Sequence, residues 1–185
     1  DNPEQCERDN YDARSRHALV RHVSSGITAG VVRLVLADES NPFEPFPMEE
    51  LGIDLSGEQA GQLLQVPRCN IAEISRFAVS KEFKRRVSEM HVASGAGAET
   101  VYRDVGDQAR RLLPHITIGL FAGIVRMSAE SGITHWYAVM EPTLLRLLSR
   151  FGIFLDAIGP LVQYHGLRQP AMGEIDAVLA GIFAK

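Results

Sequence analysis

The feature that most constrains the fold is a strand, helix, strand order in the middle of the chain. The run Ala72–Val79 (AEISRFAV) is rich in β-branched and aromatic residues, which is typical of strands. Pro114–Ser131 has helical periodicity, with a proline expected in its first turn and Gly132 at its end. Thr134–Met140 is again strand-like, so the helix is expected to cross over between two strands. The apolar positions that define the helix are Ile116, Leu120, Phe121, Ile124 and Met127.

A β-hairpin is expected ahead of this unit. His17–His22 and Val31–Leu36 are short, apolar and β-branched, and a turn at residues 24–26 separates them. A proline-rich stretch, residues 37–70, follows, in which only a short helix near Gly57–Leu64 is expected. Connections of this length are usually functional or mobile.

The second half of the chain continues the alternation. Pro142–Phe151 reads as an amphipathic helix closed by Gly152, Asp156–Tyr164 as a strand, and Gly173–Phe183 as a final helix. Between the central strand and the central helix, Ser80–Glu89 is charged, and the residues from 93 to 98 are small. The order predicts an α+β (α/β sandwich) fold with helices on a mixed sheet.

Composition narrows the class of protein. A chain of 185 residues with 45% hydrophobic content is expected to form one domain, residues 1–185. A formal net charge of −4 without a long basic run argues against nucleic acid or an anionic membrane as partner. A soluble protein is favoured by the polar start of the chain and by the lack of an apolar run of about 18 residues. The reducing cytoplasm is favoured by the presence of only two cysteines, Cys6 and Cys69.

Charged residues inside apolar strands demand a reason, because an unpaired buried charge is very unfavourable. Glu73 and Ser75 share one face of a regular strand and Arg76 points to the other, but a bulge would bring all three to one side. Arg33 lies inside VVRLVL and either pairs with Glu73 or holds a carboxylate. From spacing alone, a purely structural ion pair is at least as plausible as a catalytic site.

Two further groups are weaker on their own. Asp9 and Asp12 precede the first strand at turn spacing, and an acidic cap explains them equally well. Tyr164 and His165 follow the last expected strand and are candidates for contact with substrate, although a surface histidine is as plausible. The histidines are too scattered to indicate a metal site.

Together these residues resemble a known group. Asp9-x-x-Asp12, an arginine inside the next strand and Glu-x-Ser-Arg-Phe are similar to the bacterial acyl-homoserine-lactone autoinducer synthases and long-chain N-acyl amino acid synthases. Residues 73–81, 132–142 and 158–170 resemble still more closely the acyltransferases that accompany exosortase and PEP-CTERM sorting systems. The resemblance implies the GCN5-related N-acyltransferase (GNAT) fold, with a mixed, mostly antiparallel central sheet and helices on both faces.

The resemblance also implies a reaction. A fatty acyl group passes from the thioester of an acyl-carrier protein, or acyl-CoA, to the amine of an amino acid or related small molecule. Glu73 corresponds to the general base that deprotonates the amine, directly or through a water. Arg33 and Arg76 correspond to arginines that orient either the acidic residues or the amino substrate. Asp9 and Asp12 correspond to the acidic pair near them and help with positioning. Backbone N–H groups near Phe77 to Val79 would stabilise the oxyanion. No metal and no permanently bound cofactor are implied.

The remaining expectations concern donor and substrate. The substrate-binding candidates are Asp9, Asp12, Ser75, Phe77, Val79, Tyr164 and His165. The glycine-rich loop that grips coenzyme A in ordinary acetyltransferases is missing at residues 110–115, which favours a carrier protein as donor. Basic residues that could meet it, or could form a solvated face, are Lys81, Lys84, Arg85, Arg86, Arg110 and Arg111.

One departure from the family's pattern lies at the amino end. The helical segment that usually precedes the acidic pair, with an arginine and aromatic residues, is not found ahead of Asp9 and is expected to be missing. Two alternatives to an enzyme stay open: a non-catalytic module that binds an acyl carrier or lipid, and an interaction protein of an exosortase-type sorting system.

Overall fold

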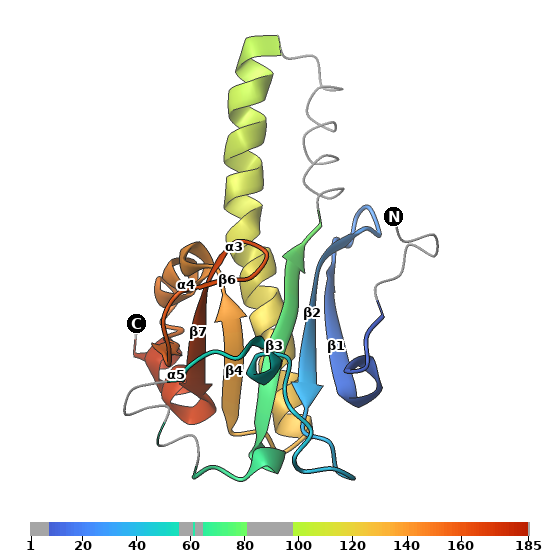
Figure 1. Ribbon diagram of the computed structural model, residues 1–185. Helices are drawn as coiled ribbons and strands as arrows, with labels where there is room; N and C mark the ends of the chain where they lie inside the picture. Colours follow the sequence, from blue (N-terminus) through green and yellow to red (C-terminus); the bar gives the residue numbers. More distant parts are fainter. Residues whose placement is uncertain (1–7, 56–60, 62–64, 81–97, 185) are drawn as a thin grey trace. The chain divides into compact units, whose positions relative to one another are not determined.

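The computed structural model describes residues 8–55, 61, 65–80 and 98–184, and for 98–111 it describes the backbone only. Within these residues one sheet has the strand order β1-β2-β3-β4-β7-β5, with β6 paired to β7 (Figure 1). The strands are β1 (Ser15–Arg21), β2 (Thr28–Leu36), β3 (Ile71–Val79), β4 (His135–Met140), β5 (Asp156–Ala157), β6 (Val162–Gln163) and β7 (Leu167–Glu174). The helices are α3 (Ala98–Glu130), α4 (Pro142–Ser149) and α5 (Ile175–Phe183), with 3-10 turns η1 (Asp12–Arg14), η2 (Glu49–Leu51) and η3 (Arg68–Asn70).

The strand pairing confirms the predicted fold class. β3 and β4 pair in parallel, whereas β7 pairs antiparallel with β4, β5 and β6. A parallel pair needs a crossover connection, and α3 supplies it between β3 and β4. The result is an α+β fold with a mixed, mostly antiparallel sheet and helices packed on it.

Several elements lie where the sequence predicts them. The hairpin turn is closed by bonds from His22 N to Ile27 O and from Gly26 N to His22 O, both 2.8 Å. The central strand, α4 and α5 are also confirmed, and Gly132 and Gly152 end their helices with positive φ. The helix expected near Gly57–Leu64 and most of residues 80–98 lie outside the described residues.

Two expectations are wrong in detail. Pro114 is not in the first turn of the central helix, because α3 begins at Ala98 and the proline lies inside it. The preceding run QARRLL is made of strong helix formers, so the helix extends through a residue that costs about 3 kcal/mol in a helix interior.

The second error concerns the last strands. Asp156–Tyr164 is not one strand but the two-residue strands β5 and β6, with Gly159 and Pro160 between them. The long strand is β7, whose sequence LRQPAMGE contains Pro170 and no β-branched residue. Burial of residues 170–173 and pairing with β4 and β5 override this poor strand propensity.

The chain divides into two compact units. The first contains Asp1–Arg16, Leu34–Ser75 and Met127–Lys185, and the second contains His17–Arg33 and Arg76–Arg126. The boundaries run through β1, β2, β3 and α3, so each of these elements contributes to both units. That residues 1–185 form a single domain stays a prediction.

The second unit is held together by close approach of α3 to the hairpin. Gly119 and Gly123 lie four residues apart, on one side of the helix. An added Cβ would lie 3.0 Å from Val20 at Gly119 and 2.7 Å from Ala18 at Gly123, so neither position accommodates a larger side chain without movement. The apolar positions predicted for this helix are all buried.

By length and composition, Leu112–Glu130 is also apolar enough to cross a membrane, with a mean hydropathy of 1.4. The core helix of a soluble protein passes the same test, and this helix carries buried core positions. The expectation that nothing in the chain reaches this length therefore does not hold for α3.

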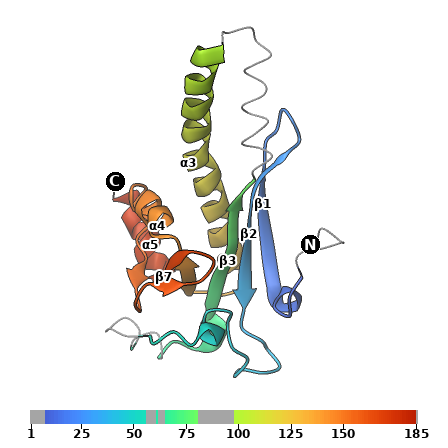
Figure 2. The ribbon, with the colours of Figure 1, turned by 45° about the horizontal axis from the view of Figure 1, so that its top comes forward.

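In the first unit, the two faces of the sheet are covered differently. Trp136 donates a hydrogen bond to Ser128 of α3 at 2.8 Å, and Gly173, paired with Trp136, faces Val178 of α5. Figure 2 shows α4 and α5 beside β7. On the opposite face, Tyr137 belongs to an apolar cluster that includes residues from the long connection between β2 and β3.

Candidate active site

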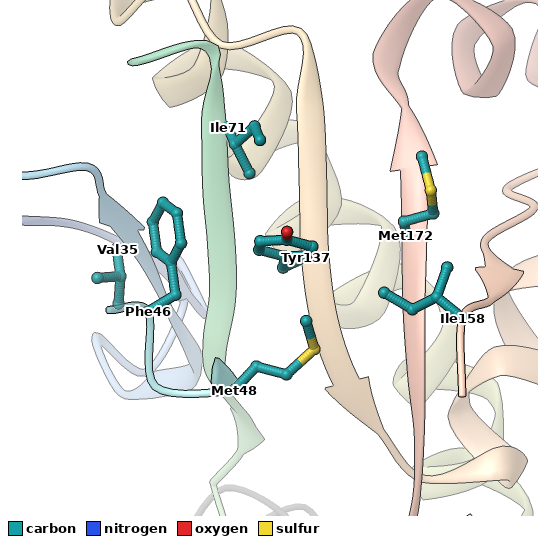
Figure 3. Close-up of a cluster of buried hydrophobic side chains, with 7 residues drawn as sticks. All are labelled: Val35, Phe46, Met48, Ile71, Tyr137, Ile158 and Met172. Carbon is teal, nitrogen blue, oxygen red and sulfur yellow. The ribbon is translucent and has the colours of Figure 1, made fainter. Parts of the chain in front are cut away.

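Glu73 lies on the face of β3 that this connection covers. Tyr137 lies beside it in the parallel register of β3 and β4, and Glu73 is only 4% exposed. Ile71 shares its face by strand alternation and belongs to the same apolar cluster as Tyr137. The cluster is drawn in Figure 3 and consists of Val35, Phe46, Met48, Ile71, Tyr137, Ile158 and Met172. The prediction that Glu73 is a buried strand carboxylate is confirmed.

The residues that enclose Glu73 come from residues 37–55, here called the covering segment. Phe46 and Met48 insert into the cluster and are 0% and 1% exposed. The backbone N–H of Met48 donates a hydrogen bond of 2.8 Å to Oε2 of Glu73. Met48 directly precedes η2, where backbone N–H groups have no partner within the turn, and a carboxylate is a good acceptor for such a group.

Arg68 and Glu49 hold the covering segment in place. The guanidinium of Arg68 donates to both carboxylate oxygens of Glu49, at 2.8 and 2.9 Å, and to the carbonyl of Glu44 at 2.9 Å. Glu49 also accepts a 2.9 Å bond from the N–H of Phe46. Burial alone would raise the pKa of Glu49, but its bonds to Arg68 and to the Phe46 N–H lower it below the ordinary value.

Arg14 anchors the other end of the covering segment. It donates to the carbonyl of Leu36 at 3.0 Å and to the carbonyl of Pro45. Its guanidinium carbon lies 5.7 Å from the centre of the Phe46 ring, and that of Arg68 lies 4.8 Å from the same centre. Two guanidinium groups therefore contact one buried ring, which is a favourable cation–π arrangement.

Two tyrosines contribute neutral hydroxyl groups beside these charges. Burial, followed by the charge of Glu49, raises the pKa of Tyr137 to about 12. Burial, followed by the neighbouring carboxylate of Glu50, raises the pKa of Tyr11 as well, while Arg14 opposes the shift. Both phenols therefore stay protonated at neutral pH, next to a carboxylate-rich cluster.

Asp9 and Asp12 form a local turn. Oδ1 of Asp9 accepts a bond from the N–H of Tyr11 at 3.0 Å, and Oδ2 of Asp12 accepts one from the N–H of Asp9 at 3.1 Å. This is the local acidic turn considered for them from sequence, and it leads into η1, which carries Arg14; the N-cap residue of η1 is Tyr11, and no side chain caps it. Their part in substrate binding stays a prediction.

The other strand candidates lie at or beyond the unit boundary in β3. Ser75 is the last residue of the first unit, and Arg76 begins the second with a φ of 50°. A left-handed non-glycine residue inside a strand interrupts regular strand geometry, here at the place where a bulge was expected. The parallel register with β4 extends from Ile71 only to Ile74.

Arg33, Phe77 and Val79 belong to the second unit. Arg33 is buried in β2 at 3% exposure, and Phe77 packs on Phe121 of α3 with ring centres 6.4 Å apart. Val79 is half-buried near the end of β3. The catalytic role of Arg33 and Arg76 and the backbone role of residues 77–79 stay predictions.

Tyr164 and His165 are exposed at the tip of the β6–β7 hairpin. Their rings contact each other edge to face at 4.7 Å, and His165 has a φ of 48°. Met172, the register partner of Tyr137, lies five positions after Leu167 along β7, which is a distance of roughly 17 Å. The structure therefore does not bring this pair to Glu73.

Sequence reasoning missed the residues that form the covering segment, hold it in place or pack against it: Tyr11, Arg14, Phe46, Met48, Glu49 and Arg68. One signal was available, since a glutamate three residues after Phe46 has the spacing of a capping box. The basic residues proposed to meet a carrier protein lie outside the described residues, or within residues 98–111, where only the backbone is described.

A mixed, mostly antiparallel sheet in which a crossover helix joins the parallel strands β3 and β4 is the fold of the GCN5-related acyltransferases. The family model described as an acetyltransferase (GNAT) domain matches residues 1–94, just over half of the 185 residues. The chain belongs to this family and is an acyltransferase.

Solved structures share this fold across nearly the whole chain. TofI, in a complex with an inhibitor and MTA, has a TM-score of 0.64 and 21% identity over 99% of this chain and 77% of its own. MesI, a CoA-dependent acyl-homoserine lactone synthase, has a TM-score of 0.56 and 20% identity over 100% and 75%. FeeM, an N-acyl amino acid synthase from uncultured soil microbes, has a TM-score of 0.50 and 13% identity over 85% and 67%. No curated protein sequence matches the chain.

Proposed function

We propose that this chain transfers a fatty acyl group from an acyl-carrier protein thioester, or from acyl-CoA, to the amine of an amino acid or a related small molecule. Glu73 takes a proton from the amine, the amine nitrogen bonds to the thioester carbonyl carbon, and the carbon–sulfur bond breaks. The thiol leaves with the proton that balances the reaction. No covalent acyl-enzyme is required.

The observation that carries this proposal is the environment of Glu73. Its carboxylate is almost fully buried, and one oxygen is fixed by the N–H of Met48 at 2.8 Å. Arg14 hydrogen-bonds to main-chain carbonyls and Arg68 pairs with Glu49, so both guanidinium groups hold the covering segment over this face of the sheet. A carboxylate oriented in this way inside an apolar cluster is suited to act as a general base.

The solved structures of similar fold support the reaction class. MesI is CoA-dependent, and FeeM is an N-acyl amino acid synthase. We infer a carrier protein as the preferred donor, because residues 110–115 lack the glycine-rich loop for coenzyme A. In this scheme Arg33 and Arg76 orient the acidic residues, which are Glu73, Asp9 and Asp12, or the amino substrate. The N–H groups of residues 77–79 stabilise the oxyanion. The cytoplasmic location and the association with an exosortase-type system stay predictions.

The test is mass spectrometry of lipid extracts from cells that overproduce the protein, compared with a Glu73→Gln variant. Removal of a general base is expected to lower product formation by about 10²–10⁴-fold. Glu174→Gln is the matched control, because Glu174 is exposed at the end of β7, and it is expected to behave as wild type.

Donor choice is tested with purified protein supplied either with acyl-CoA or with acyl-carrier protein, and with a mixture of amino acids. An N-acylated product that depends on Glu73 supports the proposal. A folded Glu73→Gln variant that retains wild-type activity refutes the role of Glu73. Binding of the acyl carrier without any product refutes the enzymatic reaction and indicates the non-catalytic module.

A further inference from the structure

We infer that Arg68 is a positioning residue for Glu73, acting through Glu49 and the turn that Phe46 and Met48 belong to. The inference rests on the proposed function of Glu73 as the base. Arg68 itself makes no described contact with Glu73, and the two residues are linked through a chain of hydrogen bonds.

The first link is the turn that presents the Met48 amide. The N–H of Glu49 donates to the carbonyl of Phe46 at 3.0 Å, and the Glu49 side chain accepts from the N–H of Phe46 at 2.9 Å. This reciprocal pair resembles a capping box, which fixes the direction of the N–H groups in the first turn. The N–H of Met48 is one of them, and it is directed at Oε2 of Glu73.

The second link is the hold of Arg68 on Glu49. A bidentate guanidinium–carboxylate pair fixes both the position and the plane of the carboxylate. Arg68 adds a bond to the carbonyl of Glu44 and a cation–π contact with Phe46, so it contacts the covering segment at three residues. Rotation of the Glu49 side chain would break its hydrogen bond with the Phe46 N–H, and the turn would lose the contact that fixes its geometry.

The third link is the chain itself. Arg68 begins η3, and η3 leads directly into β3, only five residues before Glu73. Arg68 and Glu73 therefore belong to one short segment, residues 68–73. Because Arg68 holds the covering segment against this segment, a displacement of the covering segment changes the environment of Glu73 directly. Arg14 hydrogen-bonds to Leu36, just before the covering segment, and to Pro45 within it. It acts on Glu49 through its charge but donates no described hydrogen bond to it, so it does not replace Arg68 in this chain.

The experiment is a double-mutant cycle of Arg68→Met and Glu73→Gln, read as kcat and KM for the acyl donor. Misplacing a catalytic group by a fraction of an ångström to 1 Å is expected to lower kcat by roughly 10- to 100-fold, with KM changed by no more than about twofold. In the Glu73→Gln background, Arg68→Met is expected to change the rate by less than about twofold, because residues that act as a unit are non-additive.

Two further variants control for structural damage. Arg168→Met removes an ion pair with Glu141 and a bond to a main-chain carbonyl elsewhere in the same unit, and kcat is expected to stay at the wild-type level. Arg68→Lys keeps the charge but not the bidentate fork, so its kcat is expected to lie between those of wild type and Arg68→Met. If Arg68→Met does not fold, the cycle is run with Arg68→Lys.

The possible failures are distinguishable. If Glu73→Gln keeps the wild-type rate, the proposed function fails. If Glu73→Gln is inactive but the Arg68 variant matches wild type, or lowers the rate equally in both backgrounds, the positioning role of Arg68 is refuted and the proposed function stands. Loss of kcat in the wild-type background alone supports the positioning role.

Discussion

Replacing Met48 by proline tests whether the backbone N–H of this residue holds Glu73. Met48 has a φ of −64°, which is the value that proline imposes, so the substitution removes the N–H without requiring a new backbone angle. Met48→Ala is the matched control, because it also removes the buried thioether side chain but keeps the donor. The comparison of the two variants therefore isolates the hydrogen bond to Glu73.

The expected difference in stability follows from two terms. A hydrogen bond to a charged group contributes about 1.5–3 kcal/mol, and this is lost in Met48→Pro only. Proline at a compatible φ returns about 0.4–1 kcal/mol by restricting the unfolded chain. Met48→Pro should therefore be roughly 0.5–2.5 kcal/mol less stable than Met48→Ala, which corresponds to a Tm lower by about 1–10 °C for a chain of this size.

The two variants should also differ in acyl transfer. Thermal unfolding followed by circular dichroism gives Tm, and turnover of acyl donor with an amino-acid acceptor gives kcat. A loss of about 1.4 kcal/mol in the orientation of the base corresponds to a tenfold lower kcat for Met48→Pro relative to Met48→Ala. Equal Tm and equal kcat in the two variants would show that the Met48 N–H neither stabilises nor orients Glu73.

Two further predictions concern stability. Gly152→Ala should lower the free energy of unfolding by about 2–5 kcal/mol, since φ is +81° and an added Cβ would lie 2.4 Å from the carbonyl oxygen of Gly181. Gly132→Ala, where φ is +66° and an added Cβ meets open space, should lower it by only about 1–2 kcal/mol. Chemical denaturation measures both values. Equal losses at both positions would contradict the close backbone contact. Because the pKa of Glu49 is lowered in the folded state, its ionised form stabilises the fold above the ordinary carboxyl pKa of 4.5, and this contribution is lost as the pH falls through the lowered value. The Tm advantage of wild type over Glu49→Gln should therefore be present at pH 7 and shrink on acidification, and an advantage that persists at pH 2 would refute the pairing with Arg68.

Local patterns in the sequence predict a large part of the fold. The hairpin, β3, β4, α4 and α5 follow from periodicity and from glycine and proline at turns and helix ends. Glu73 stands out for the same reason, because a carboxylate in an apolar strand is costly wherever the strand is buried. Errors occur where local preference and tertiary structure disagree, as at Pro114 inside α3 and Pro170 inside β7.

The surroundings of Glu73 depend on contacts between residues that are far apart in the chain. Arg68 reaches back 19 residues to Glu49, and Met48 reaches forward 25 residues to Glu73. No periodicity marks such pairs, since Met48, Glu49 and Arg68 each read as part of an ordinary polar or proline-rich loop.

The sequence by itself therefore determined which strand carries the carboxylate and that the fold is α+β, because helical and strand spacing are properties of neighbouring residues. Only the tertiary structure decided how that carboxylate is held, because the covering segment owes its course to a cation–π stack on Phe46 and to hydrogen bonds from Arg14 and Arg68. These interactions form only after the sheet has brought distant parts of the chain together.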